Sequence, residues 1–116
     1  MFQVDENCEP HALDAEKVQR FEDAVPDMSY VVTLFKVMGD ETRAKILYLL
    51  SKESFCVHDL AAALSTSVSN VSHHLRLLKA ARLVRTKRVG QRVCYSLDDE
   101  HVAHLLEEAL KHASHN

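Results

Sequence analysis

Residues 57–81 read VHDLAAALSTSVSNVSHHLRLLKAA, and this stretch decides the fold. Residues 57–64 have the composition of a short helix, and residues 65–67 (STS) form a polar turn. Residues 68–81 predict a longer helix, because apolar side chains recur in them at helical spacing. The side chains that we expect to face the core are Val68, Val71, Leu75 and Leu78. Two helices joined by a tight polar turn indicate a helix-turn-helix.

A β-hairpin is predicted directly after this unit. Residues 84–88 and 91–97 are rich in Val, Thr and Tyr and read as two strands. Val89 and Gly90 lie between them as the turn, where glycine accepts a positive φ. A hairpin in this place is a wing, so the expected fold class is mainly α with a β-hairpin wing, a winged helix-turn-helix.

Further helices are predicted on the N-terminal side. Residues 14–24, 28–38 and 41–51 have apolar residues at helical spacing, and Asp14 and Asp40 are suited to cap the first and third of them. With 116 residues and 47% hydrophobic content, the chain is expected to form a single domain around one core.

Residues 99–114 predict a last, amphipathic helix, with Asp98 or Asp99 as its cap. Its apolar stripe consists of Val102, Leu105, Leu106, Ala109, Leu110 and Ala113. The helix therefore has one face that needs to be covered.

Charge is distributed unevenly along the chain, although the formal net charge is only -3. Residues 1–59 hold six Lys or Arg against twelve Asp or Glu, and residues 98–116 hold one against five. Residues 60–97 hold seven Lys or Arg and no acid. A solvated basic face is the plain interpretation, but a cationic module between acidic segments favours a phosphate-binding surface.

This basic module is expected to bind DNA through the second helix of the helix-turn-helix and through the wing. If the apolar side of that helix faces inward, the outward side chains suited to a major groove are Ser69, Ser72, His73 and Arg76, with Lys79 placed for phosphate. The wing offers Lys87, Arg88, Gln91 and Arg92 for the DNA backbone or a minor groove. The alternative for His73 and His74 is that one packs and the other is only solvated, and for His74 this is favoured over a base contact.

Potential metal ligands lie at both ends of the last helix. His112 and His115 are spaced i, i+3, which lets two imidazoles share one ion. Asp99 and His101 converge if Asp99 occupies the non-helical N-cap. Thirteen residues separate Asp99 from His112, a span of about 19 Å along a helix, so one chain holds two half-sites.

Two antiparallel copies of this helix in a twofold dimer complete both sites between the chains. Four nitrogen and oxygen ligands suit Zn(II) or Co(II) and leave no open position for a catalytic water, which argues against hydrolysis. His104 and Glu108 lie on nearly the same side of the helix and remain alternative ligands.

A second constellation joins Cys8 and His11 with Cys56 and His58. Thiolate and imidazole ligands favour softer ions such as Cd(II) or Pb(II) as well as Zn(II). The alternative is that Cys56 is a small buried residue. Cys94 in the wing is expected to pack.

Several function classes are set aside on composition. No apolar run reaches the length of a membrane span, and three widely spaced cysteines indicate a reducing, cytoplasmic location without a disulfide framework. An enzyme is not expected, because a nucleophile motif and a Gly-rich phosphate loop are missing from the sequence. A regulator that responds to oxidation of Cys8 and Cys56, or a zinc-buffering protein, stays open as an alternative.

Nearly the whole chain resembles the ArsR/SmtB family of metal-responsive winged-helix repressors. The resemblance rests on the stretches GDETRAKILYLL (39–50), FCVHDLAAAL (55–64), SNVSHHLRLLKAARLV (69–84), VCYSL (93–97) and DDEHVAHLLEEALKH (98–112). It implies a homodimer that binds operator DNA without metal and releases it when metal binds, which derepresses a metal efflux or resistance gene.

The resemblance also implies roles for residues. Asp99, His101, His112 and His115 match the zinc site of the family's C-terminal helix, and the backbone carbonyl of Arg82 is implied as acceptor from His112. The N-terminal arm, residues 1–13, resembles the cadmium- and lead-sensing branch at Cys8 and Cys56. There His58 stands in place of a second cysteine and Ala12 in place of another, so the soft site is altered. On this basis residues 57–81 are the helix-turn-helix, 84–97 the wing and 99–114 the dimerisation and metal-site helix.

Overall fold

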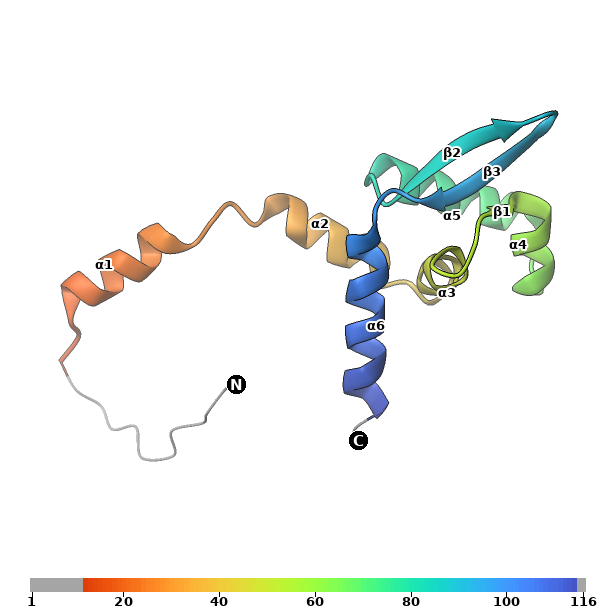
Figure 1. The fold of residues 1–116 in the computed structure, drawn as a ribbon. Helices are drawn as coiled ribbons and strands as arrows, with labels where there is room; N and C mark the ends of the chain where they lie inside the picture. Colours follow the sequence, from red (N-terminus) through yellow and green to blue (C-terminus); the bar gives the residue numbers. More distant parts are fainter. Residues whose placement is uncertain (1–11, 115–116) are drawn as a thin grey trace.

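The structure of the protein, a computed structural model, describes residues 12–114. Within this range the chain forms six helices and a three-stranded sheet (Figure 1). The helices are α1 (Ala15–Ala24), α2 (Ser29–Met38), α3 (Glu41–Leu50), α4 (Val57–Ala63), α5 (Val68–Ala80) and α6 (Glu100–Ser114). The strands are β1 (Phe55–Cys56), β2 (Val84–Val89) and β3 (Arg92–Leu97). None of the described helices is long and apolar enough to cross a membrane.

Local side-chain caps set the starts of α1, α3 and α5. The Asp14 carboxylate accepts from the backbone N–H of Lys17, and that of Asp40 accepts from the N–H of Arg43, which confirms both predicted caps. Ser67 caps α5 in the same way, and the Asn70 side chain donates to Thr66 Oγ1 at 3.1 Å. These bonds satisfy donors that a helix start leaves unpaired and fix the turn before α5.

Non-glycine residues in the left-handed region end α4 and α5. Ser65 has φ 52° and Arg82 has φ 61°. After α5, Leu83 N–H donates to Leu78 O and Arg82 N–H donates to Lys79 O, which is the bond pattern of a Schellman motif. A left-handed conformation costs a non-glycine residue about 1–2 kcal/mol. Because Arg82 adopts this conformation, the backbone turns directly from α5 into β2 of the wing.

The sheet is antiparallel with strand order β1-β3-β2. The two wing strands match the prediction, but the turn is one residue later than expected: Val89 pairs with Arg92, and Gly90, with φ +65°, and Gln91 make the turn. The sequence analysis missed β1, because a two-residue strand is too short to show a period of alternation.

The core lies among α3, α4, α5 and the base of the wing. Its largest fully buried side chains are Ile46, Leu47, Leu60, Leu75, Leu78, Leu83 and Val71. The prediction that Val68 faces the core is wrong, since its side chain is 39% exposed. Val68 is the first residue of α5, beside the exposed Ser65 and Ser67, and the buried stripe begins one turn later at Val71.

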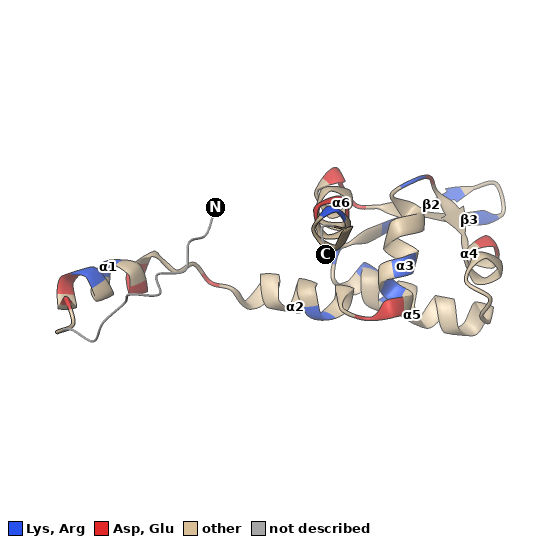
Figure 2. Cartoon of the chain, turned by 90° about the horizontal axis from the view of Figure 1, so that it is seen from below, with Lys and Arg blue, Asp and Glu red and all other residues tan. Residues whose placement is uncertain are grey.

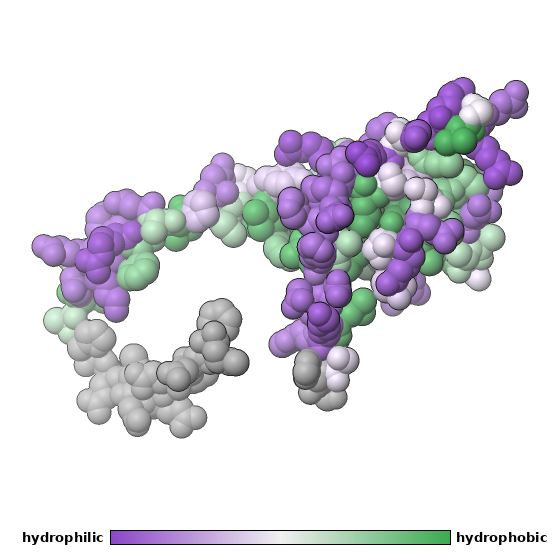
Figure 3. All heavy atoms as spheres, viewed as in Figure 1, coloured by the Kyte–Doolittle hydropathy of each residue, from purple (hydrophilic) through white to green (hydrophobic). Residues whose placement is uncertain are grey.

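The remaining helices are only partly covered. In α1 and α2 no residue is fully buried. α2 packs Leu34, Val37 and Met38 against the core and exposes apolar side chains on its other side, and α1 extends beyond it away from the core, so that the two helices form an arm (Figures 1 and 3). The arm gives the molecule a longest extent of 66 Å. In α6 only Val102 is buried, and Leu105 and Leu110 of the predicted stripe are exposed. A single chain therefore leaves the apolar surface of α1, and part of the apolar surfaces of α2 and α6, exposed.

Candidate functional site

The outward side of α5 presents the residues predicted to bind DNA. Ser69, His73, Arg76 and Lys79 are exposed and Ser72 is half-buried, while Val71, Leu75 and Leu78 occupy the opposite, buried side. A helix with short donors and one arginine on its free face has the shape and the chemistry to enter a major groove.

The wing carries the other predicted contacts. Lys87 and Arg88 on β2, Gln91 in the turn and Arg92 on β3 are all exposed. A cavity of about 490 Å³ lies between α4, α5 and β3, and Ser72, Gln91 and Arg92 all line it. Residues of α5 and of the wing thus face one concave surface. Lys and Arg gather on α5 and along the wing, whereas α1 and α6 carry acidic residues as well (Figure 2).

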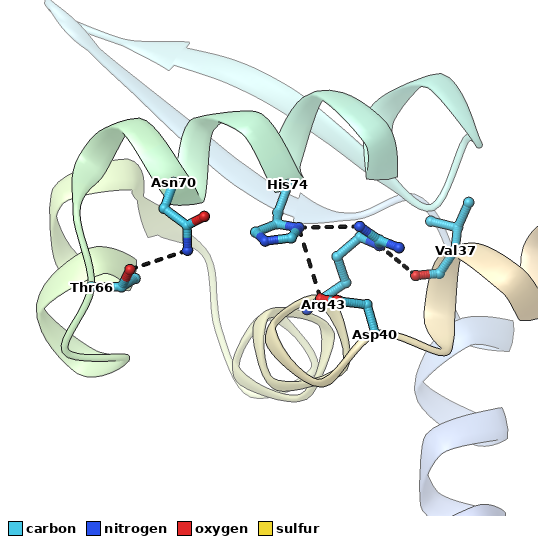
Figure 4. Close-up of polar contacts among 6 residues, drawn as sticks. All are labelled: Val37, Asp40, Arg43, Thr66, Asn70 and His74. Carbon is cyan, nitrogen blue, oxygen red and sulfur yellow. Dashed lines mark hydrogen bonds and ion pairs between the residues drawn. The ribbon is translucent and has the colours of Figure 1, made fainter.

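His74 sits on the inner side of α5 and ties this helix to α3 (Figure 4). Its Nδ1 lies 3.2 Å from Arg43 Nη1 and 3.8 Å from Asp40 Oδ2, and its side chain is only 13% exposed. Arg43 Nε also donates to the backbone oxygen of Val37 at 2.6 Å. The structure therefore gives His74 the packing role that the sequence analysis favoured over a base contact.

The same cluster lowers the pKa of Asp40 below its ordinary value. The main cause is the hydrogen bond from the Arg43 backbone N–H. Burial opposes it as the next largest effect, and the charges of Arg43 and then His74 lower the pKa further. Asp40 is therefore both the cap of α3 and a fixed negative charge facing the histidine of α5.

The two residues predicted as the first metal half-site come together at the start of α6. Asp99 Oδ1 accepts from the backbone N–H of His101 at 2.9 Å and lies 3.4 Å from His101 Nδ1, and both side chains are exposed. The convergence arises because Asp99 precedes the helix as its cap, as expected. His104 and Glu108 line a surface hollow together with His101, so their role as alternative ligands stays open.

The residues predicted as the second half-site belong to the other end of the chain's last helix. His112 is exposed in the last turn, and His115 lies outside the described residues. Among residues 12–114 no three His, Cys, Asp or Glu side chains come close enough to hold an ion. An exposed carboxylate and imidazoles are a donor set that suits zinc, but one chain offers only part of it.

The soft-metal constellation can be followed only in part. Cys56 is half-buried at the start of α4, its Sγ donates to Asp59 Oδ2 at 3.2 Å, and His58 is exposed. Cys8 and His11 lie outside the described residues. Directly across the sheet from Cys56 is Cys94, a neighbour that the sequence analysis did not anticipate because it did not predict β1.

Arg82 has a structural partner of its own. Its guanidinium lies 4.7 Å from the centre of the Tyr30 ring, and the Tyr30 hydroxyl donates to the backbone oxygen of Ala81 at 2.8 Å. The end of α5 is thereby fastened to α2. No hydrogen bond within the described chain joins Arg82 to His112.

A basic recognition helix followed by a basic wing defines a winged helix-turn-helix DNA-binding regulator. Comparisons with known proteins agree. Residues 40–86 match the family described as "Bacterial regulatory protein, arsR family". The chain is 42% identical over 108 residues to a cadmium resistance transcriptional regulatory protein CadC homolog of Staphylococcus aureus, covering 90% of this chain and 89% of that one.

Two further proteins are similar over most of the chain. A transcriptional repressor SmtB homolog of Synechocystis sp. is 36% identical, covering 90% of this chain and 82% of the other. The solution structure of a homodimeric winged helix-turn-helix DNA-binding domain from Mycobacterium bovis has a TM-score of 0.70 at 24% identity, covering 91% of each chain. The chain belongs to the ArsR family of bacterial regulatory proteins. The expected fold is confirmed, and so is the expected class, a transcriptional regulator rather than an enzyme.

Proposed function

We propose that this protein is a repressor that binds operator DNA as a metal-free homodimer and releases it when Zn(II) binds. The observation that carries the proposal is the placement of ligands on α6. Asp99 and His101 converge at the start of the helix, and His112 is exposed at its far end. Neither end alone can hold an ion, but an antiparallel second copy brings opposite ends together.

The exposed apolar surface supports the dimer. Leu105 and Leu110 of α6 and Val18 and Phe21 of α1 are exposed in the single chain. Pairing two copies through these faces removes apolar surface from water, at roughly 25 cal/mol for each Å². A twofold axis then makes each contact twice and creates two equivalent metal sites.

Each proposed site takes Asp99 and His101 from one chain with His112 of the partner subunit and His115 of the partner subunit. Two or more imidazoles with one carboxylate suit Zn(II) and Co(II). When bound, the ion neutralises the carboxylate and cross-links the two α6 helices. Zinc weakens DNA binding if it binds more tightly to the dimer conformation that cannot bind DNA. The coupling free energy between zinc binding and DNA binding that this requires is about 1–3 kcal/mol.

A second, softer site is proposed from Cys8, His11, Cys56 and His58. The S. aureus relative is described as a cadmium resistance regulator, which supports Cd(II), and Pb(II) by the same chemistry, as further effectors at this site. Because two of its four ligands are histidines, the site suits borderline ions better than an all-thiolate site does.

DNA contact is proposed through both basic elements. α5 enters the major groove with Ser69, Ser72, His73 and Arg76, and Lys79 contacts phosphate. The wing residues Lys87, Arg88, Gln91 and Arg92 follow the backbone or a minor groove. The link to the metal runs through His112, whose second ring nitrogen donates to the backbone oxygen of Arg82 at the end of α5.

The test is a titration of operator affinity with zinc, measured by fluorescence anisotropy at fixed salt. We expect stoichiometric zinc to release the wild type, and His101→Asn to remove the response. His104→Asn, on the same face of α6, distinguishes the proposed ligand set from the alternative one, and we expect it to keep the response. Loss of binding only with an oxidant supports a thiol-responsive regulator instead, and no DNA binding at all supports a zinc buffer.

A further inference from the structure

Two cysteines face each other across the sheet at the point where the wing meets the helix-turn-helix. The register of β1 and β3 places Cys56 directly opposite Cys94. Directly opposed residues of antiparallel strands have their side chains on the same face, with Cβ atoms about 4.5–5.5 Å apart. A disulfide requires Cα atoms about 4.4–6.8 Å apart and Cβ atoms about 3.5–4.5 Å apart, so only a small approach of the strands is needed.

The environment of the pair favours a disulfide over a metal ion. Both thiols are free and half-buried. The preceding pair, Phe55 and Tyr95, packs against the core, and the alternation of a strand turns Cys56 and Cys94 to the outer face. A tetrahedral ion needs more ligands than this, and within residues 12–114 no third ligand joins the two sulfurs. A disulfide needs only the two.

We propose that Cys56 and Cys94 are a redox-sensitive thiol pair that forms an intrachain disulfide. The oxidant is a low-molecular-weight disulfide of the glutathione type. One cysteine thiolate attacks a sulfur of this disulfide, which forms a mixed disulfide and expels one small thiol. The second cysteine thiolate attacks the protein sulfur of the mixed disulfide, which closes the bond and expels the second small thiol. The two protein thiols lose two protons and two electrons, and the small disulfide gains them.

The position of the bond connects it to both DNA-binding elements. Cys56 directly precedes α4, and its thiol donates to Asp59 in the first turn of that helix. Cys94 lies opposite Lys87 on the other wing strand, so Lys87, Cys94 and Cys56 form one row across the sheet. Forming the disulfide removes the hydrogen bond that the Cys56 thiol donates to Asp59. It also pulls the wing strand β3 toward the start of α4. It also takes Cys56 away from the proposed soft-metal site, so oxidation and metal binding there exclude each other.

The first test examines the bond itself and does not depend on the proposed function. The full chain, stripped of metal with a chelator, is equilibrated in glutathione disulfide and glutathione, its free thiols are alkylated, and its peptides are identified by mass spectrometry. We expect a linked pair of peptides containing Cys56 and Cys94, with Cys8 alkylated. Cys8→Ser should still form the link, and Cys94→Ser should stop at the mixed disulfide. A link through Cys8, or mixed disulfides only in the wild type, overturns the proposal.

The second test concerns regulation and rests on the proposed DNA binding. We expect the oxidised Cys8→Ser protein to bind operator DNA about fivefold or more weakly than its reduced form, the lower end of typical coupling between sites. Cys94→Ser, shown by circular dichroism and thermal melting to be folded, should bind equally well with and without oxidant. Equal affinities of oxidised and reduced Cys8→Ser overturn the regulatory role. Failure of the reduced protein to bind DNA contradicts the proposed function and leaves the disulfide intact.

Discussion

Two regions of the molecule differ in whether a single chain covers their apolar side chains. One is the helix-turn-helix with its wing, and the other consists of the helices at the two ends of the chain. α3, α4, α5 and the wing bury a common core within one chain, and their caps and turns are satisfied locally. α1, α2 and α6 expose apolar side chains, and the metal ligands proposed for the two ends of α6 do not meet within one chain. The DNA-reading part is thus finished in the monomer, whereas the proposed sensing part requires a second copy.

The largest expected effect is on the free energy of unfolding, and it is seen by comparing one leucine from each region. Leu75 is 1% exposed in the core, and Leu110 is 53% exposed and lines an apolar hollow of about 440 Å³ between α3, α4 and α6. Leu75→Ala should lower the free energy of unfolding by about 2–5 kcal/mol, because it leaves a cavity in a packed core. Leu110→Ala should instead weaken dimerisation.

Urea unfolding and sedimentation equilibrium over a range of protein concentrations separate these two effects. If Leu110→Ala destabilises the dilute chain as much as Leu75→Ala does, α6 is part of a closed monomer core and the contrast fails.

If the proposed metal sites are shared between chains, two complementary variants should recover zinc binding when they pair. One chain carries Asp99→Ala with His101→Ala, and the other carries His112→Ala with His115→Ala. Each homodimer should lose zinc affinity by more than the roughly 10- to 100-fold that loss of an outer-shell partner costs, because half of every ligand set is missing. A mixed dimer should regain one intact site out of two.

Isothermal titration of the purified heterodimer, with each homodimer as control, measures this stoichiometry. Sites contained within a single chain would leave the heterodimer without any intact site, so a heterodimer that binds no zinc contradicts the shared arrangement.

The direct contacts to DNA are expected to come from the complete region. Arg76→Ala should cost about 1–3 kcal/mol of operator affinity and relax discrimination at one base pair, as loss of a bidentate base contact does. Lys87→Ala should reduce the slope of log affinity against log salt by about 0.9, because one phosphate contact is lost. Lys45→Ala is the control, since Lys45 is an exposed cation of α3 paired with Glu41. A matching loss with Lys45→Ala would indicate a nonspecific charge effect.

The sequence predicted best what is decided locally. The Asp14 and Asp40 caps and the helical stripe of α5 depend on residues within a few positions of each other, and they are found as expected. β1 was missed because its existence depends on pairing with β3, nearly forty residues away. The Cys56–Cys94 pair was missed for the same reason.

The metal ligands are a different case. The spacing of these residues along one helix can be read from the sequence, and Asp99 contacts His101 as expected. The rest of each proposed site depends on a second chain, and residue spacing within one sequence can only suggest how that chain is placed.

The smallest expected effect is on the pH dependence of the unfolding free energy, and it is seen by comparing two aspartates whose pKa values are both lowered. Asp40 lies between α3 and α5, whereas Asp27 lies before α2, where the Ser29 hydroxyl and then the Ser29 backbone N–H lower its pKa. A carboxyl whose pKa is lower in the folded state binds fewer protons there, so its contribution to stability is present at neutral pH and is lost as pH falls through about 4 and below. Asn can still cap a helix but cannot titrate or carry the charge that faces Arg43 and His74.

Wild type and Asp40→Asn should therefore differ in unfolding free energy by a constant amount above about pH 5, and the difference should shrink as the pH falls toward 3. Asp27→Asn should show a weaker pH dependence, because the hydrogen bonds of Asp27 stay within an arm that buries no residue of α2. Urea titrations at a series of pH values give both curves. If Asp27→Asn gave the larger acid-dependent change, the arm would be contributing to the cooperative core, and the division of the chain into a complete and an incomplete region would have to be redrawn.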